Sequence, residues 1–232
     1  MKTIGLIGGM SWESAAEYYR LINEGAKARL GGLHSADCLM YSFDFAEIEA
    51  LQMAGDWETA TQYMVEAARR LERGGAACIV ICTNTMHRMA NEVQAAVDLP
   101  LIHIADPTAA AVQAAGIARI GLLGTRFTME GDFYRGRLES LHELDVLVPD
   151  ERGREAVHRI IYDELVVGEI RPESRMAYLG IIDQLEAAGA QGVILGCTEI
   201  GLLIQQAHTA LPVFDTTRLH ALAAVDFALA DG

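Results

Sequence analysis

Two stretches of the chain decide its fold: GAACIVICTNT at residues 75–85 and GAQGVILGCTE at residues 189–199. Each is a short apolar run, rich in β-branched residues, that ends in thiol and hydroxyl side chains. They begin about half the chain length apart, which indicates one structural element used twice. A duplicated chain can place two similar reactive turns on opposite sides of one cleft. Chemistry that must reach both faces of a single carbon atom needs that arrangement.

The duplication continues around this pair. Further matches occur in the same order and at nearly the same spacing: GLIGGM at 5–10 with GLLGTR at 121–126, Tyr18 with Tyr134, and Leu-Pro at 99–100 with Leu-Pro at 211–212. Such regularity predicts two pseudo-symmetric α/β lobes.

Apolar runs alternate with longer amphipathic stretches, a pattern typical of βαβ units and mainly parallel sheets. The predicted strands are 3–7, 36–41, 78–82, 101–104, 119–123, 145–148, 193–195 and 212–214. The predicted helices are 11–29, 57–74, 85–96, 108–115, 128–141, 151–167, 172–188 and 218–230. Ligands of open α/β sheets bind beyond the carboxyl ends of the strands. The segments that follow strands here are 8–11, 82–85, 124–128 and 196–199.

Composition excludes several classes of partner. The 232 residues carry a formal net charge of −14, which disfavours nucleic acid and anionic membrane surfaces. No apolar run approaches the roughly 20 residues that span a bilayer, and residues 1–10 suit a first buried strand better than a signal peptide. We therefore expect a cytoplasmic protein without a membrane partner.

The cysteines and lysines narrow the chemistry further. The four cysteines lack disulfide or zinc spacing, so reduced thiols and no metal site are expected. The only lysines are Lys2 and Lys27, and neither follows a strand. A pyridoxal Schiff base or a P-loop lysine therefore has no candidate, and no cofactor is expected.

Cys197 is the strongest candidate for a catalytic residue. It follows a predicted strand and Gly196, at a turn where backbone N–H groups of the coming helix are expected to lower the thiol pKa. When the two repeats are superposed on their polar residues, Thr83 matches Cys197 and Cys82 matches Gly196. Cys82 remains a rival for the second position, although strand alternation predicts that Cys82 and Thr83 point to opposite sides.

The other strand-end residues are candidates for substrate binding. Glycine turns at helix starts can cradle anions or serve as plain caps, and both readings apply to the turn at 8–11 and its repeat at Thr125. His87 is expected to stabilise the fold or to support the site residues and not to act as a base. The candidate substrate-binding residues are Met10, Ser11, Gln52, Asn84, Thr85, Thr125, Thr198 and Glu199.

At CTNTMH (82–87), GCTE (196–199) and GGMS (8–11) the chain resembles the aspartate/glutamate racemase family over essentially its whole length. The opening IGLIGGMSWES (4–14), taken with TNTMH, most resembles a bacterial subgroup of aspartate/glutamate or broader amino-acid racemases. The resemblance implies a cofactor-independent isomerase, commonly dimeric, with its active site in the cleft between two lobes. It places the first lobe at 1–98, completed by 211–232, and the second at 99–210.

Members of that family typically use one cysteine on each face of the α-carbon. The resemblance implies that Cys197 is the catalytic cysteine of the carboxyl-terminal half of the chain. Thr83 occupies the position where family members usually carry the cysteine of the amino-terminal half. The resemblance further implies that Asn84, Thr85 and Thr198 grip the α-carboxylate. The resemblance also implies that the cysteine of the carboxyl-terminal half, here Cys197, serves the L-enantiomer. Because a threonine hydroxyl is far too weak an acid to ionise easily, L-aspartate and L-glutamate are therefore expected to react faster than their D-enantiomers.

Two alternatives keep the same fold. A hydantoin racemase, a maleate isomerase or an arylmalonate decarboxylase resembles this layout too, although the polar residues at 84–85 and 198–199 favour amino acids. The missing amino-half cysteine also allows a non-catalytic metabolite sensor. Exchange of the α-proton separates that sensor from the enzymes.

Overall fold

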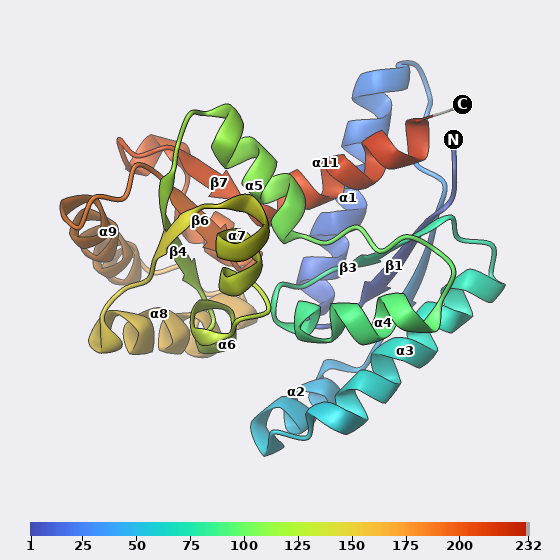
Figure 1. Ribbon diagram of the computed structural model, residues 1–232, viewed down its shortest axis with the longest axis horizontal. Helices are drawn as coiled ribbons and strands as arrows, with labels where there is room; N and C mark the ends of the chain where they lie inside the picture. Colours follow the sequence, from blue (N-terminus) through green and yellow to red (C-terminus); the bar gives the residue numbers. More distant parts are fainter. Residues whose placement is uncertain (231–232) are drawn as a thin grey trace. The chain divides into compact units, whose positions relative to one another are not determined.

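The computed structural model describes residues 1–230 and confirms an α/β fold with two parallel sheets. The chain forms two compact units (Figure 1). The first comprises Met1–His103 and the C-terminal segment that begins at His220, and the second comprises Ile104–Leu219. Residues 231 and 232, which close the predicted first lobe, lie outside the described residues.

The first unit is built on a three-stranded parallel sheet with the order β2-β1-β3. Its strands are β1 (Ile4–Gly8), β2 (Cys38–Ser42) and β3 (Cys78–Ile81). Its helices are α1 (Trp12–Leu30), α2 (Phe45–Ala54), α3 (Trp57–Arg73), the 3₁₀ helix η1 (Thr85–Met89), α4 (Ala90–Ala96) and most of α11 (Thr216–Leu229).

Alternate residues of these strands point to opposite faces of the sheet, and helices cover both faces. One face packs against α1 and α11, with Leu6 and Val80 among its buried side chains. The other packs against α2, α3 and α4, with Ile7 and Ile81 on that side. Because both faces are covered by helices, β1 and β3 are buried and free of charged or polar side chains, as the sequence pattern predicts.

The second unit is built on a four-stranded sheet with the order β5-β4-β6-β7. Its strands are β4 (Arg119–Gly124), β5 (Asp145–Leu147), β6 (Val193–Gly196) and β7 (Val213–Asp215). Its helices are α5 (Ala105–Ala114), α6 (Arg126–Glu130), α7 (Arg135–His142), α8 (Glu151–Asp163), η2 (Leu165–Val167), α9 (Pro172–Ala187), α10 (Ile200–Leu203) and η3 (Gln206–His208). One face packs against α8, α9 and α10, and the other against α5 and α7.

Several predicted elements need correction. Residues 101–104 form only a bridge between Leu101 and Ile79, not a strand. The predicted helix 128–141 is two helices, α6 and α7, and the helices α2 and α10 were missed. Strand β7 pairs with β6 in the second sheet, although the sequence analysis assigned 211–232 to the first lobe. The Leu-Pro segment at 99–100 thus leads into a single bridge beside β3, whereas the Leu-Pro segment at 211–212 leads into the strand β7 beside β6.

A search of the described residues for membrane spans finds no helix with the length and apolar character to cross a bilayer.

Candidate active site

In the first unit, two of the predicted site segments leave the sheet at the same edge. Strands β1 and β3 pair in parallel, with Ile7 opposite Ile81, so segments 8–11 and 82–85 emerge side by side. The turn after β1 requires glycine at Gly9, which has a φ of 81°. A Cβ at Gly9 would lie 2.3 Å from the carbonyl oxygen of Phe43.

Met10 and Ser11 both have a structural role in this turn. Met10 is buried in the apolar cluster that also contains Ile48 and Met86. Ser11 is the N-cap of α1, and its hydroxyl accepts a hydrogen bond from the backbone N–H of Ser14 at 3.4 Å. The substrate contacts expected of Met10 and Ser11 stay predictions.

Cys82 and Thr83 have different surroundings at the end of β3. Cys82 is buried in the core between β3 and helices α1 and α11, and burial raises its thiol pKa well above its usual range. Thr83 follows it and is half-buried. Cys82 is therefore a core thiol, and the side chain available at this strand end is the Thr83 hydroxyl.

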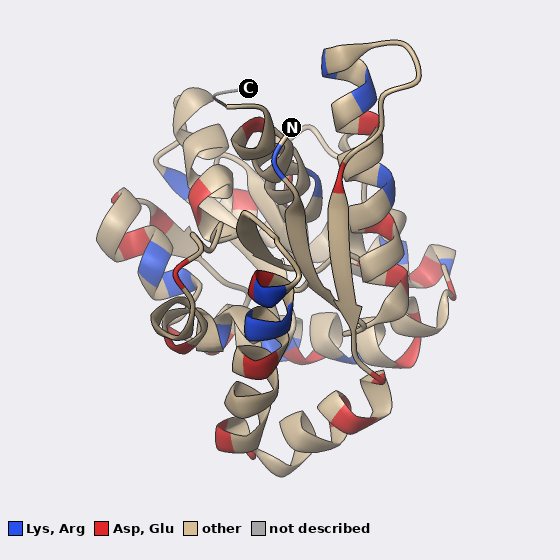
Figure 2. Cartoon of the chain, turned by 90° about the vertical axis from the view of Figure 1, so that its right-hand side faces the viewer, with Lys and Arg blue, Asp and Glu red and all other residues tan. Residues whose placement is uncertain are grey.

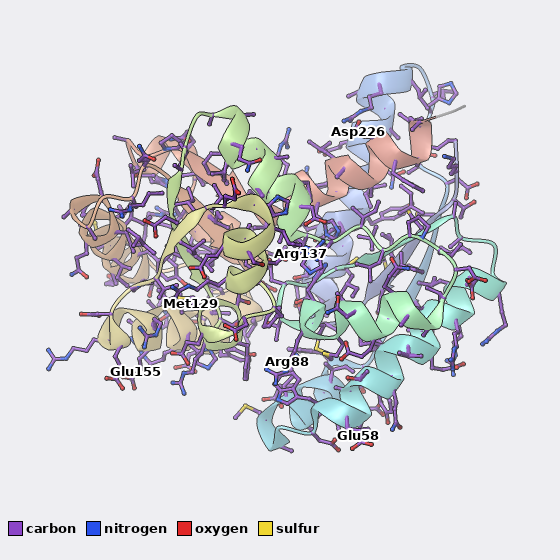
Figure 3. All side chains as sticks on the ribbon, in the orientation of Figure 1. Glu58, Arg88, Met129, Arg137, Glu155 and Asp226 are labelled. Atoms are coloured by element: carbon purple, nitrogen blue, oxygen red, sulfur yellow. The ribbon has the colours of Figure 1, made fainter. Side chains whose placement is uncertain are left out.

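The structure brings Gln52 to the same strand end. Gln52 comes from α2, is buried, and donates a hydrogen bond from Nε2 to Sδ of Met86 at 3.2 Å. Asn84 and Thr85, which precede Met86, are also buried. Arg88, labelled in Figure 3, lies over the ring of Trp57 with its guanidinium carbon 4.6 Å from the ring centroid. That contact ties the segment after Thr85 to α3.

His87 anchors the backbone of Thr83. A carbonyl oxygen can only accept, so Nδ1 of His87 carries the proton that it donates to the Thr83 oxygen at 2.7 Å. The buried His87 ring packs against the rings of His103 and His220, with centroids 4.7 Å and 5.4 Å away. His87 is thus structural, as the sequence analysis expected.

The ring of His220 is fixed by its own partners. Its Nε2 donates to the Ile102 carbonyl oxygen at 2.6 Å, so its Nδ1 accepts from the Tyr18 hydroxyl at 2.8 Å. These bonds join α1, α11 and the segment before α5, all within the first unit.

In the second unit, β4 and β6 end together in the same way. Gly124 lies opposite Gly196, and a Cβ on Gly196 would lie 2.9 Å from the carbonyl oxygen of Leu123. Thr125 is the N-cap of α6, where its hydroxyl accepts from the backbone N–H of Thr128 at 3.3 Å. The plain cap reading of Thr125 therefore holds, and its expected substrate contact stays a prediction.

Cys197 and Glu199 form a hydrogen-bonded pair at the end of β6. The Cys197 thiol donates to Oε2 of Glu199 across 2.9 Å, and Glu199 is buried. Burial raises the pKa of Cys197 well above its usual range, and the charge and hydrogen bond of Glu199 raise it further. The backbone N–H groups of Thr198 and Glu199 lower it, as expected, but by less. The expectation of a lowered thiol pKa was therefore wrong, because it counted the helix amides and left out the burial of the thiol and the neighbouring Glu199 carboxylate.

Thr198 is held by a residue that the sequence analysis missed. The Thr217 hydroxyl donates to the Thr198 hydroxyl at 3.1 Å, from the start of α11 directly after β7. Its position beyond the carboxyl end of a strand was a signal that could have identified it.

Strand register makes Thr83 and Cys197 equivalent. In the first unit Ile7 lies opposite Ile81, and in the second Leu123 lies opposite Leu195. Since 5–10 repeats as 121–126, Ile81 corresponds to Leu195, and Thr83, two residues later, corresponds to Cys197. This equivalence combines the likeness of 5–10 to 121–126 with the hydrogen-bonded registers, and it does not use the likeness between 82–85 and 196–199.

Within residues 1–230, no three His, Cys, Asp or Glu side chains are grouped so that they could hold a metal ion.

Comparison with known proteins defines the class of this chain. The model of the Asp/Glu/Hydantoin racemase family matches residues 7–224. The chain belongs to this family, and it is an isomerase of the racemase type.

Solved structures support the same assignment over the full length. A candidate Asp/Glu racemase from Yersinia pestis is 58% identical, with 99% of this chain and 100% of that chain covered and a TM-score of 0.93. An aspartate racemase homologue from Pyrococcus horikoshii OT3 is 35% identical, with 98% and 99% covered and a TM-score of 0.86. A curated relative, the broad specificity amino-acid racemase RacX of Bacillus subtilis, is 21% identical over 75% of each chain.

Proposed function

We propose that this chain racemises aspartate or glutamate without a cofactor, and that it processes the L-enantiomers faster. The observation that carries the proposal is the strand register that makes Thr83 equivalent to Cys197. The names of the relatives, which include aspartate racemase homologues and a broad specificity amino-acid racemase, support amino acids as the substrate class. The proposal requires both motifs to act on opposite faces of one α-carbon.

Cys197 begins the reaction as a thiol, since burial and Glu199 raise its pKa. To become a base it passes its proton to the Glu199 carboxylate, which its sulfur already contacts at 2.9 Å. The thiolate then removes the α-proton of the L-substrate, and the electron pair of the broken C–H bond moves into the α-carboxylate. Because Glu199 is then protonated and neutral, this buried site does not hold a second carboxylate charge beside the thiolate.

Donors at the strand ends hold the substrate carboxylate as its negative charge grows. We assign this role to Asn84, Thr85 and Thr198, because each lies just beyond the carboxyl end of a strand and Asn84 and Thr85 are buried there. Thr198 is held by the Thr217 hydroxyl. Fixed donors aimed at developing charge are usually the largest single source of rate acceleration.

The second face of the carbon is served by Thr83 or by a water that it positions. Cys82, which was the rival, lies in the core, and burial raises its pKa. A threonine hydroxyl ionises with far more difficulty than a thiol, so Thr83, or the water that it positions, is the poorer acid and the poorer base on this face. This asymmetry is the reason that L-substrates are expected to react faster.

The test is exchange of the α-proton in deuterated water, followed by NMR over a panel of L- and D-amino acids and hydantoins. We expect loss of the α-proton signal first for L-aspartate or L-glutamate, with no response to a chelator or to added pyridoxal phosphate. Initial exchange rates are the right measure, because the enantiomers have equal free energies at equilibrium. Exchange confined to hydantoins, or no exchange with any amino acid, would reject the proposal.

A further inference from the structure

The second carboxylate of an acidic amino acid needs a partner of its own at the strand ends. In the proposed function the amide and hydroxyl groups after β3 and β6 bind the α-carboxylate, while Glu199 is itself an acidic residue. The chain has 32 acidic and 18 basic residues, and most of those in the view of Figure 2 lie on helices. A substrate with two carboxylates therefore requires a local cation beside the reactive turn.

Two arginines lie within three residues after a strand of the second unit: Arg126 after β4 and Arg218 after β7. No lysine lies in these segments. Arg218 follows the carboxylate of Asp215, whose Oδ1 accepts a hydrogen bond from the Arg218 N–H at 3.2 Å. Because Arg218 shares its turn with an acidic residue, Arg126 is the stronger candidate.

Strand register places Arg126 beside the reactive turn. Gly124 at the end of β4 lies opposite Gly196 at the end of β6, in parallel pairing. The segments 125–126 and 197–198 therefore leave the sheet side by side at its carboxyl edge. Neighbouring strands lie about 4.8 Å apart, which is less than the length of an extended arginine side chain. The Arg126 guanidinium can thus reach a substrate whose α-carbon is held at Cys197.

The backbone of Arg126 is fixed by a histidine of α8. Arg126 is the first residue of α6, and its N–H donates to Nδ1 of His158 at 3.3 Å. The His158 ring contacts the rings of Phe127 and Tyr162, with centroids 6.2 Å and 4.7 Å away. Burial lowers the pKa of His158, and the charge of Arg126 lowers it further. The imidazole is therefore neutral at neutral pH and can accept this bond.

The guanidinium of Arg126 is left available because its nearest acidic neighbour on α6 is already paired. Glu130 lies four residues further along α6, a spacing that favours an ion pair. Its Oε1 instead accepts from Nε of Arg154 at 2.8 Å, and Arg154 also donates to the Pro149 carbonyl oxygen at 2.8 Å. Arg126 is exposed, and its side chain makes no ion pair or hydrogen bond with any described residue.

Building on the proposed function, we propose that Arg126 binds the side-chain carboxylate of aspartate or glutamate, and that His158 is its positioning residue. A guanidinium presents two parallel N–H groups to a carboxylate, a geometry that an amide or an apolar side chain does not match. In this arrangement the end of β4 selects the charge of the side chain, and the end of β6 acts on the α-carbon.

The first arm of the test measures binding of succinate and of its monoamide, succinamate, by isothermal titration calorimetry. Succinate has two carboxylates and no stereocentre, so it tests the dicarboxylate site apart from racemisation. Arg126→Gln is expected to raise the Kd for succinate roughly 100-fold, and to reduce the preference for succinate over succinamate at least about tenfold. Arg126→Lys keeps the charge without the planar fork and should give an intermediate Kd.

Arg69→Gln is the matched control for the change in net charge. Arg69 is an exposed residue near the end of α3, which leads into the amino end of β3, at the edge of the first sheet that carries no candidate site residue. This variant should bind succinate as the wild type does. An equal loss of succinate binding in Arg69→Gln and Arg126→Gln would reduce the effect to overall charge and would overturn the assignment.

The second arm compares exchange of the α-proton of L-aspartate and L-asparagine. Arg126→Gln should lower kcat/KM for L-aspartate roughly 100-fold, mainly through KM, and that for L-asparagine by less than about threefold. His158→Phe removes the acceptor of the Arg126 N–H and should lower the preference for L-aspartate. His158→Asn supplies an oxygen acceptor and should restore it, which a merely structural role of the ring would not predict.

The two arms separate the Arg126 assignment from the proposed function. A wild type that does not bind succinate, or a Kd for succinate that stays within about threefold in Arg126→Gln, would overturn the assignment even if amino acids are racemised. Succinate binding that depends on Arg126, without α-proton exchange of any amino acid, would reject the proposed racemisation and support the dicarboxylate site.

Discussion

The carboxyl ends of β3 and β6 hold equivalent positions in the two units, yet their side chains differ in acidity and surroundings. At β6 the residue is Cys197, a thiol that donates to the buried carboxylate of Glu199. At β3 it is Thr83, whose backbone oxygen is anchored by His87 and whose side chain has a hydroxyl instead of a thiol. A duplicated fold can therefore keep the position of a reactive group while changing its chemistry.

A buried tyrosine that occurs once in each unit also has different surroundings in the two units. Tyr18 and Tyr134 are repeat partners, and both are fully buried. The Tyr18 hydroxyl donates to His220, which is itself bonded to the backbone at Ile102. Burial raises the pKa of Tyr134 well above its usual range, with Thr108 close by in place of an imidazole. In the first unit, a cluster of histidines therefore lies next to the weaker catalytic candidate, Thr83. In the second unit, the Glu199 carboxylate contacts the stronger candidate, Cys197.

The largest effect should follow from removing the thiol at β6. Cys197→Ala is expected to lower α-proton exchange by about 10²–10⁴-fold, the usual contribution of a positioned acid–base group, with an unchanged circular dichroism spectrum. Cys82→Ala is the matched control. It removes a core thiol and should lower thermal stability while exchange persists. Near wild-type exchange in Cys197→Ala would remove this residue from the mechanism.

The Glu199 carboxylate should matter next. Glu199→Gln removes the group that accepts the thiol proton, so exchange at neutral pH should fall by roughly 10²-fold. Because Glu199 raises the pKa of Cys197, the variant should form thiolate at lower pH than the wild type. The rate at which Cys197 is alkylated, measured as a function of pH, reports that change. The measurement uses a Cys38→Ser background so that the other half-buried thiol does not react. An alkylation profile that stays in place would show that Glu199 does not control the thiol.

A smaller effect should follow from making the two strand ends alike. Thr83→Cys restores a second thiol, and we expect it to raise initial exchange of D-aspartate or D-glutamate at least about tenfold. Thr83→Ser keeps a hydroxyl and should leave the preference for L-substrates in place. Equal exchange of both enantiomers by the wild type, together with an inert Thr83→Cys, would show that Thr83 is not the second catalytic position.

The smallest effect concerns the turn that holds the first site. Gly9→Ala places a Cβ against the Phe43 carbonyl at a φ of 81°, so it should lower the free energy of unfolding by about 1–3 kcal/mol. Gly180→Ala is the control at an exposed position of helix α9, where no atom lies within 4 Å of the new Cβ. It should raise stability by about 0.5–1 kcal/mol. Urea unfolding of both variants gives the comparison, and a stable Gly9→Ala would mean that the turn can rearrange.

Much of the fold could be predicted because buried segments have apolar residues at regular positions in the sequence. A strand covered on both faces must be apolar where it is buried, so β1, β3, β6 and the part of β4 after its exposed Arg119 could be located from their composition. Helix α2 was missed because only Ile48 and Gln52 of its ten residues are buried, which leaves no apolar stripe to detect. The break between α6 and α7 was missed as well, although Gly131 stands at the C-cap of α6.

The sequence by itself determined the repeat, the strand ends and the two candidate positions, Cys197 and Thr83 with Cys82 as its rival, because these depend on residue type and spacing along the chain. Only the tertiary structure decided the protonation of Cys197, since that depends on how deeply the thiol is buried and on where the Glu199 carboxylate points. The same is true of the His87 anchor on Thr83 and of the Thr217 hydroxyl on Thr198. Electrostatic energies depend on distances and desolvation in three dimensions, and neither quantity can be obtained from the order of the residues alone.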